Sequence, residues 1–228
     1  MKVIILAAGK GSRLGQADQP KPLTRLINGK SILEHQLTNI EPFVSLDHVI
    51  AVVGYRKEMI MDAFPELLFV YNPKYASENT SKSLLRALKK VDDDVLWING
   101  DVVFHPTVLK NILTNMSNRM VVNVGKVGEE EVKYRTDAKG NVLEVSKQVI
   151  NAQGEVLGIY LFTKKDVPVL RSALEKCRDD DYFEKGMEFC IKEGIEIQSV
   201  PVDAHLCTEV DFPTDLEHAN TLINQWAI

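Results

Sequence analysis

Short apolar runs alternate, in the first half of the chain, with segments in which apolar residues recur at helical spacing. The apolar runs are predicted to be buried strands, at residues 2–6, 48–54, 67–72, 94–99 and 120–127. The periodic segments are predicted to be helices, at residues 31–40, 57–64, 81–91 and 106–115. Ser31 and Glu34 have the spacing of a capping box at the start of the first helix. This alternation predicts a mostly parallel sheet with helices on both faces.

The second half of the chain has a different pattern. Residues 131–136 and 142–147 flank a turn at 137–141, which predicts an antiparallel hairpin. Further strands are predicted at 154–162 and 195–202, and further helices at 165–177, at 182–193 and from Pro213 towards Trp226. The expected fold is therefore α/β and Rossmann-like, with a mostly parallel mixed sheet flanked by helices and a small antiparallel subregion. We expect one domain over residues 1–228.

Composition narrows the classes of partner. The 228 residues are 45% hydrophobic and 26% charged, which is ordinary for a globular protein. The net charge of −5 gives no global basic field, so no nucleic acid partner is expected. The N-terminal apolar run is too short for a signal peptide or a membrane span, and no membrane association is expected. Cys177, Cys190 and Cys207 lack metal-ligand spacing, so we expect a reduced, cytoplasmic protein, either a monomer or a homodimer.

The first predicted strand ends in small residues and leads directly into a glycine-rich loop. Such an ending leaves backbone N–H groups open to a ligand. Three cations follow, Lys10, Arg13 and Lys21, and prolines on both sides of Lys21 stiffen its segment. Open amides and convergent cations suit a polyphosphate, and the alternative is an ordinary turn with surface lysines. The expected nucleotide contacts here are Leu6, Ala7, Ala8, Gly9, Gly11 and Ser12, with Gly54 and Gly100 at the ends of two other strands.

Two carboxylates follow predicted strands. Asp101 comes just after residues 94–99, and Asp211 lies between residues 195–202 and the helix that begins at Pro213. Ligands of open α/β sheets bind beyond the carboxyl ends of the strands. Two carboxylates at such ends can share Mg²⁺, which prefers hard oxygen ligands and keeps positions for substrate phosphates. Each aspartate alone also suits a turn or a helix N-cap, so both are candidate Mg²⁺ ligands with a structural alternative.

The N-terminal motif resembles that of a known enzyme family. Gly-x-Gly-x-Arg-Leu followed by Pro-Lys-Pro-Leu is similar to the start of the sugar-phosphate and alcohol-phosphate nucleotidyltransferases. Gly-Asp at 100–101 and Glu-Val-Asp at 209–211 match the same pattern. The loop at 14–19 is shorter than is usual in the sugar-nucleotide members. The resemblance implies a nucleotide-binding half over residues 1–127 and an acceptor-binding half over residues 128–228.

The middle of the chain resembles one branch of this family. Tyr-Ala-Ser-Glu-Asn-Thr-Ser-Lys-Ser-Leu at 75–84 is similar to a segment of the CTP-using cytidylyltransferases of the phosphocholine and phosphonate type. The resemblance implies that Asn79, Thr80 and Ser81 lie against the nucleotide. The same three residues also suit a helix N-cap, and the two roles are compatible.

The acceptor half carries further resemblances to these cytidylyltransferases. They are a Glu-Glu-x-Lys segment, a Ser-Lys pair and a Gly-Glu-x-x-Gly-Ile strand. They imply that Lys147 binds the phosphate of the acceptor, and the other expected acceptor contacts are Lys133, Glu155, Gly158, Tyr182 and Glu209. The alternative for Lys133 is an exposed position on the hairpin, and the alternative for Tyr182 is packing in the core. The glutamates at 129–131, Glu155 and Tyr182 would also suit an acceptor that carries an amine.

The resemblance as a whole implies a Mg²⁺-dependent cytidylyltransferase. It would transfer CMP from CTP to a phosphorylated small alcohol or a phosphonate, such as phosphocholine or 2-aminoethylphosphonate, and release pyrophosphate. Lys21 would contact the α-phosphate, Arg13 the β- and γ-phosphates, and Lys147 the acceptor. Catalysis would then rest on positioning and charge neutralisation. Two alternatives are a sugar-1-phosphate nucleotidyltransferase that uses UTP, dTTP or GTP, and a nucleotide-binding regulatory module without turnover.

Overall fold

The computed structural model describes residues 1–15, 18–125 and 127–226. Two residues of the predicted loop at 14–19, residues 16 and 17, lie outside the described residues, as does residue 126 of the predicted strand at 120–127. Within the described ranges, no helix combines the length and the apolar character that are needed to cross a membrane.

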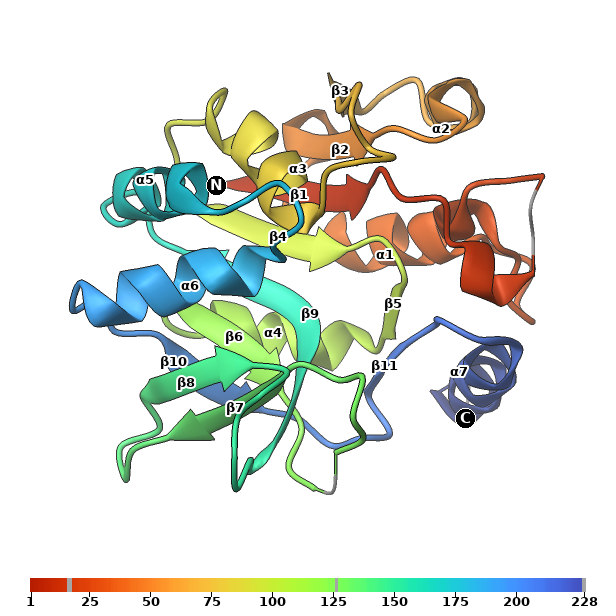
Figure 1. Cartoon of the computed structure of the whole chain (residues 1–228). Helices are drawn as coiled ribbons and strands as arrows, with labels where there is room; N and C mark the ends of the chain where they lie inside the picture. Colours follow the sequence, from red (N-terminus) through yellow and green to blue (C-terminus); the bar gives the residue numbers. More distant parts are fainter. Residues whose placement is uncertain (16–17, 126, 227–228) are drawn as a thin grey trace.

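A mixed sheet forms the centre of the molecule (Figure 1). Its strands, in spatial order, are β10 (Gln198–Pro201), β6 (Arg119–Val122), β9 (Gly154–Phe162), β4 (Val95–Asn99), β1 (Lys2–Ala7), β2 (Val49–Val53) and β3 (Leu68–Tyr71). β1 pairs parallel with β2 and β4, and β2 pairs parallel with β3. β10 also pairs parallel with β6, whereas β9 runs antiparallel between β4 and β6. The predicted mostly parallel, mixed sheet is therefore confirmed.

Helices cover both faces of this sheet. They are α1 (Ile32–Ile40), α2 (Lys57–Ala63), α3 (Thr80–Leu88), α4 (Pro106–Leu113), α5 (Val167–Lys176) and α6 (Phe183–Lys192), whereas α7 (Pro213–Trp226) packs beside residues 207–209, away from the main sheet. In Figure 1, α3, α5 and α6 lie in front of the sheet, while α1 and α4 lie behind it. The predicted capping box is confirmed, because the Ser31 hydroxyl accepts from the Glu34 N–H and the Glu34 carboxylate accepts from the Ser31 N–H.

The central strand β1 contributes side chains to two separate hydrophobic cores. Ile4 packs on the side of α3, α5 and α6, and Val3 and Ile5 pack on the side of α1 and α4. All three side chains are fully buried. Alternate residues of a strand face opposite sides of a sheet, so a strand that is covered on both faces must be apolar throughout. This explains why the first apolar run of the sequence has no polar alternation.

A second, two-stranded sheet was not predicted from the sequence. β5 (Val102–Phe104) pairs antiparallel with β11 (Cys207–Glu209), and the ladder continues as the Val210 N–H donates to the Asp101 carbonyl oxygen at 2.9 Å. Asp101 and Asp211 thereby come to the same end of this short sheet. The pairing brings together two segments that are more than a hundred residues apart in the sequence.

The predicted hairpin forms the antiparallel subregion. β7 (Lys133–Thr136) pairs with β8 (Val142–Ser146), and β7 also pairs with the start of β9. The strand predicted at 120–127 ends earlier, at Val122, because the ladder between β6 and β9 becomes irregular there. Beyond this point the Asn123 N–H still donates to the Glu155 carbonyl oxygen at 3.0 Å. The hairpin is therefore attached to the main sheet at the start of β9 and lies beside β6 and β10 in Figure 1.

Candidate active site

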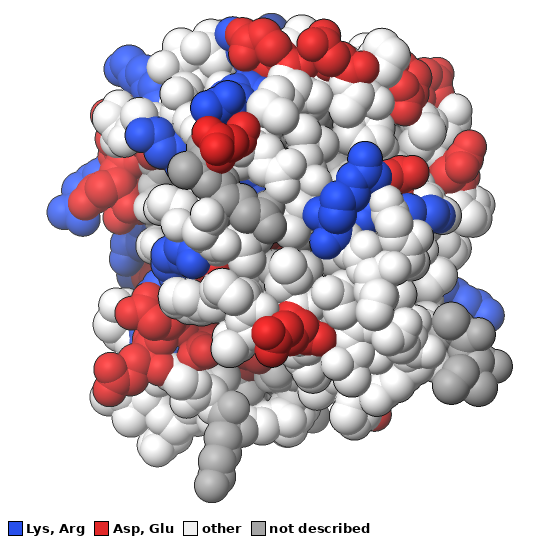
Figure 2. All heavy atoms as spheres, turned by 90° about the vertical axis from the view of Figure 1, so that its right-hand side faces the viewer, with Lys and Arg blue, Asp and Glu red and all other residues white. Residues whose placement is uncertain are grey.

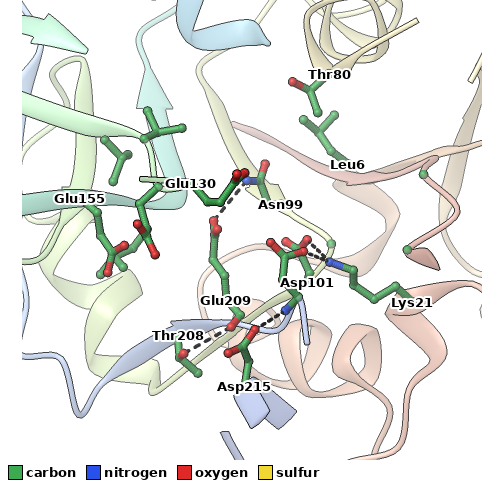
Figure 3. A pocket seen from close by; sticks show the side chains of 18 of the residues that line it. Leu6, Lys21, Thr80, Asn99, Asp101, Glu130, Glu155, Thr208, Glu209 and Asp215 are labelled. Carbon is green, nitrogen blue, oxygen red and sulfur yellow. Dashed lines mark hydrogen bonds and ion pairs between the residues drawn. The ribbon is translucent and has the colours of Figure 1, made fainter. Parts of the chain in front are cut away.

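A cavity of about 690 Å³ opens at the carboxyl ends of β1 and β4. One wall comes from the N-terminal loop, and the opposite wall comes from the hairpin, β9 and the start of α6. β11 forms the floor between them, and Figure 3 shows Glu209 from this strand between the two walls. This is the position at which ligands bind in open α/β sheets.

The predicted glycine loop holds Lys21 in place. Gly11 has a φ of +60°, and a Cβ atom added there would lie 2.6 Å from the Cβ of Lys21. A side chain at position 11 would therefore meet both backbone strain and a steric clash. Gly9, Ser12 and Arg13 line the cavity beside it. The backbone of the glycine loop thus lines the same cavity as the cationic side chains of Arg13 and Lys21.

Lys21 joins the two predicted metal ligands. Its Nζ lies 2.7 Å from Asp101 Oδ2 and 2.6 Å from Asp211 Oδ1, as the dashed lines of Figure 3 indicate for the drawn residues. Burial alone would lower the pKa of Lys21, but the two carboxylates outweigh it and raise that pKa above its ordinary value. Lys21 is therefore a permanently charged ammonium that neutralises this carboxylate pair.

Asp211 is fixed from two further sides. Its Oδ2 pairs with Arg13 Nη2 at 3.0 Å, and the Arg13 guanidinium lies 5.3 Å from the centre of the Phe212 ring. The Asp215 carboxylate accepts from the backbone N–H groups of Asp211 and Phe212 at 2.9 Å and 2.7 Å, at the start of α7. Asp215 therefore caps the start of α7 and holds the Asp211 backbone in position.

The carboxylate pair fits a divalent cation that is shared with a ligand. Asp101 Oδ1 is buried and has no hydrogen-bond partner among the described residues, so it is a free acceptor beside the cavity. The described residues form no cluster of three or more His, Cys, Asp or Glu side chains with metal-binding geometry. Mg²⁺ is commonly held by one or two carboxylates together with substrate phosphates, so two aspartates suffice for such a site.

Glu209 lies at the centre of the cavity. Its Oε1 accepts from Asn99 Nδ2 at 3.4 Å and lies 2.6 Å from where a Cβ of Gly158 would be. Gly158 has a φ of +66°, so only glycine leaves room for this carboxyl group without strain. Burial first, and then the charges of Asp101 and Asp211, raise the pKa of Glu209 well above its ordinary value. Gly158 thus shapes the site from behind Glu209, although it does not itself line the cavity.

Lys147 stands at the rim of the acceptor wall. Its Nζ lies 3.4 Å from Glu130 Oε2 and 5.2 Å from the centre of the Tyr182 ring. Tyr182 lines the cavity and is half-exposed, so it is not a core residue. Lys133 does not reach the cavity, because its Nζ donates to the Lys147 carbonyl oxygen at 3.0 Å and supports that segment from behind.

Glu184, in the first turn of α6, is a cavity residue that was not predicted from the sequence. Its Oε1 accepts from the Tyr160 hydroxyl at 2.9 Å, and its Oε2 is buried without a partner among the described residues. Burial raises the pKa of Glu184 to about 7. In the sequence, an acidic residue in the first turn of a helix is indistinguishable from one that stabilises the helix dipole. Its burial could therefore not be foreseen.

Most of the predicted site residues are brought together by the fold. The residues that line the cavity are Leu6, Ala7, Gly9, Gly11, Ser12, Arg13, Lys21, Thr80, Gly100, Asp101, Lys147, Glu155, Tyr182, Glu209 and Asp211. Glu155 is held by a hydrogen bond from Asn123 Nδ2, and burial raises its pKa.

Four of the predicted nucleotide contacts lie outside the cavity lining: Ala8, Gly54, Asn79 and Ser81. Gly54 allows a close approach of strand ends, since a Cβ there would lie 2.5 Å from the Ala8 carbonyl oxygen. Asn79 is the N-cap of α3, which confirms the capping role, and Ser81 is fully buried in the same helix. These residues support the site rather than line it.

Two curated relatives resemble the chain, one along nearly all of its length and the other along about half of it. The chain is 29% identical to the bifunctional protein GlmU of Methanocaldococcus jannaschii over 227 residues, which are 96% of this chain and 53% of that relative. It is 36% identical to the CMP-5'-(3-aminopropyl)phosphonate synthase of Streptomyces rubellomurinus over 120 residues, which are 49% of this chain and 19% of that relative. The chain thus spans about half the length of the first of these curated relatives and less of the second.

The fold is also that of a solved enzyme structure. The CTP:phosphocholine cytidylyltransferase LicC of Streptococcus pneumoniae superposes with a TM-score of 0.83 at 21% identity, over 97% of this chain and 98% of that one. A sequence profile of the MobA-like NTP transferase domain matches residues 3–176, which are most of the chain and include β1, the glycine loop and Asp101. The chain therefore belongs to the family of MobA-like NTP transferase domains.

Proposed function

We propose that this nucleotidyltransferase transfers CMP from CTP to a phosphorylated small alcohol or a phosphonate and releases pyrophosphate. The observation that carries the proposal is the division of the cavity into two ends. At one end, Arg13 and Lys21 lie beside the carboxylates of Asp101 and Asp211. At the other end, Lys147 stands above a pocket that is lined by side chains of β9 and α6. A triphosphate at the first end and a phosphorylated acceptor at the second would meet between them.

In the proposed reaction, an oxygen of the acceptor phosphate or phosphonate attacks the α-phosphorus of CTP. The new bond joins that oxygen to the α-phosphorus, and the bond from the α-phosphorus to the oxygen between the α- and β-phosphates breaks, so that this oxygen leaves with pyrophosphate. The attacking oxygen is already ionised near neutral pH, so no protein base or nucleophile is required. The chain contributes positioning and charge, with Lys21 on the α-phosphate, Arg13 on the leaving pyrophosphate and Lys147 on the acceptor.

Asp101 and Asp211 would hold Mg²⁺ in this site. When bound, the ion supplies positive charge that neutralises phosphate oxygens. Lys21 already lies against both carboxylates, so its ammonium is next to the position that such phosphates would occupy. The roles of Lys21 and Arg13 do not change with the identity of the divalent cation.

The choice of CTP and of a small acceptor rests on relatives. The names of the Streptomyces rubellomurinus enzyme and of the Streptococcus pneumoniae enzyme specify CMP or CTP and a phosphonate or phosphocholine. Both fit an acceptor end that is lined by carboxylates and by Tyr182. The chain covers only part of these two relatives. The proposal therefore concerns this chain and does not extend to the activity of a larger protein.

The test is a matrix of four nucleoside triphosphates against phosphorylated alcohols, phosphonates and sugar 1-phosphates, with pyrophosphate release as the readout. We expect turnover with CTP and at least one phosphorylated alcohol or phosphonate. Turnover only with a sugar 1-phosphate and UTP, dTTP or GTP would overturn the proposal. Nucleotide binding without pyrophosphate release from any pair would instead identify a regulatory module.

A further inference from the structure

The acceptor end of the cavity is strongly acidic. Its lining carboxylates are Glu130, Glu131, Glu155, Glu184 and Glu209, and Lys147 is the cation that lines this end among the described residues. Figure 3 shows Glu130 and Glu155 on the side of the cavity that faces away from Lys21, with Glu209 between. A phosphate alone would add further negative charge to this end, so the carboxylates require another explanation.

Glu184 is the most deeply placed of these acids and is only 6% exposed. The Tyr160 hydroxyl satisfies Oε1 at 2.9 Å, whereas Oε2 has no donor among the described residues. Tyr160 and Phe183 are both almost fully buried around it, with their rings 4.9 Å apart, so the carboxylate cannot swing out into water. A buried carboxylate oxygen without a donor is costly unless a ligand supplies one.

The neighbouring cations are engaged elsewhere. Lys147 pairs with Glu130 and lies over the Tyr182 ring, and it acts on Glu184 only as a weak charge at longer range. Lys133 donates to a backbone carbonyl behind the wall. Lys21 is bound to the aspartates at the other end of the cavity. At this end of the cavity, two lining residues therefore keep a buried carboxylate oxygen without a partner among the described residues: Glu131, through Oε2, and the more deeply buried Glu184, through Oε2.

We propose that Glu184 forms an ammonium-binding subsite, and that the acceptor carries a primary alkylammonium group besides its phosphate or phosphonate. This inference rests on the proposed function, because it identifies the acceptor class for the same cavity. The ammonium donates to Glu184 Oε2, and the Tyr182 ring beside it already accommodates the Lys147 ammonium 5.2 Å from its centre.

The geometry favours an ammonium with N–H groups over a quaternary one. Glu184 Oε2 needs a hydrogen-bond donor, and a trimethylammonium group has none. Lys147, the predicted phosphate ligand, and Glu184 line the same end of the cavity, so we expect one short ligand to contact both. The acceptor class is therefore a short aminoalkyl phosphate or aminoalkyl phosphonate.

The experiment compares aminoethyl phosphate, phosphocholine and ethyl phosphate, which differ only at the end that would meet Glu184. Steady-state KM is measured with saturating CTP, and binding to the nucleotide-free full chain is measured by calorimetry. We expect KM and Kd for aminoethyl phosphate to be about tenfold or more below those for ethyl phosphate, with phosphocholine between them. Glu184→Gln should abolish this preference, so that aminoethyl phosphate and ethyl phosphate give similar values in this variant.

The matched control is Glu188→Gln on the same helix, where the carboxylate pairs with Lys185 and does not line the cavity. It should retain the preference. Equal binding of aminoethyl phosphate and ethyl phosphate, or an equal loss of both in Glu184→Gln, would overturn the subsite. Calorimetry separates the two proposals: pyrophosphate release without an amine preference refutes only the subsite. An amine preference in binding without any pyrophosphate release from CTP refutes only the proposed function.

Discussion

The ammonium of Lys21 lies 2.7 Å from Asp101 Oδ2, although 80 positions separate the two residues in the sequence. Lys21 contacts Asp211 at nearly the same distance, and its side chain is only 10% exposed. The site therefore contains its own cation between two carboxylates before any ligand arrives. On the outer face shown in Figure 2, Lys and Arg side chains are interspersed with Asp and Glu, so this charge arrangement is local rather than part of a broad basic field.

Replacement of this ammonium should mainly affect catalysis. Lys21→Ala removes a preorganised charge from the α-phosphate position, and we expect kcat/KM to fall by about 10²–10³-fold. The circular dichroism spectrum should be retained, because the two aspartates are partly exposed and water can solvate them. Lys139→Ala, at the turn of the hairpin, is the control and should leave kcat/KM unchanged. Near-normal turnover of Lys21→Ala would remove Lys21 from the proposed mechanism.

The carboxylate pair should determine the response to divalent cations. Asp101→Asn and Asp211→Asn keep the side-chain shape but remove the charge that Mg²⁺ requires. We expect each variant to need a higher Mg²⁺ concentration for half-maximal rate and to lose about 10²–10³-fold in kcat at fixed Mg²⁺. Asp92→Asn, which alters an exposed pair with Lys164, serves as the control. An unchanged Mg²⁺ titration in both variants would contradict the metal assignment.

The glycine loop allows a test that separates strain from a clash. Gly11 and Gly15 both have positive φ, at +60° and +76°, so alanine at either position should reduce stability by about 1 kcal/mol. Only at Gly11 would the new Cβ meet the Lys21 side chain, whereas no described atom lies within 4 Å at Gly15. We expect kcat/KM to fall at least tenfold in Gly11→Ala alone, and the clash to lower the melting temperature of Gly11→Ala below that of Gly15→Ala. Equal activities would show that the loop does not position Lys21.

Glu184 should make stability depend on pH. Burial raises its pKa from 4.5 to about 7, so the folded state holds a proton that the unfolded chain has released. The free energy of unfolding should therefore decrease as pH rises from about 4.5 through about 7, by up to about 3 kcal/mol from this group.

Glu184→Gln cannot ionise and still offers an oxygen to the Tyr160 hydroxyl. Urea unfolding at pH 5 and pH 8 should show a smaller decrease for this variant than for the unmodified chain. Glu155 and Glu209 also have raised pKa values, so a residual decrease is expected in both proteins. The same decrease in the variant and the unmodified chain would place the titrating groups elsewhere.

Local patterns predicted the main architecture. β1 and β4 are apolar on both faces because helices cover both sides of the sheet, and that burial is visible in the sequence as unbroken apolar runs. The glycine loop and Asp101 follow such strands immediately, so topology alone places them at the same edge. The N-cap at Asn79 was also predicted from the sequence, because capping depends on residues that are adjacent in the chain.

Only the tertiary structure decided which residues face the cavity. Ser81 and Thr80 are neighbours in α3, yet one is fully buried and the other lines the cavity, because helix rotation sets their directions. The β5–β11 pair and the partnerless oxygen of Glu184 depend on contacts between segments that are far apart in the chain. Strand pairing and burial are properties of the closed fold, since the energy of each group depends on neighbours that the local sequence does not specify. The sequence by itself thus determined the sheet and its ligand edge, and the packing of distant segments determined the chemistry of the acceptor end.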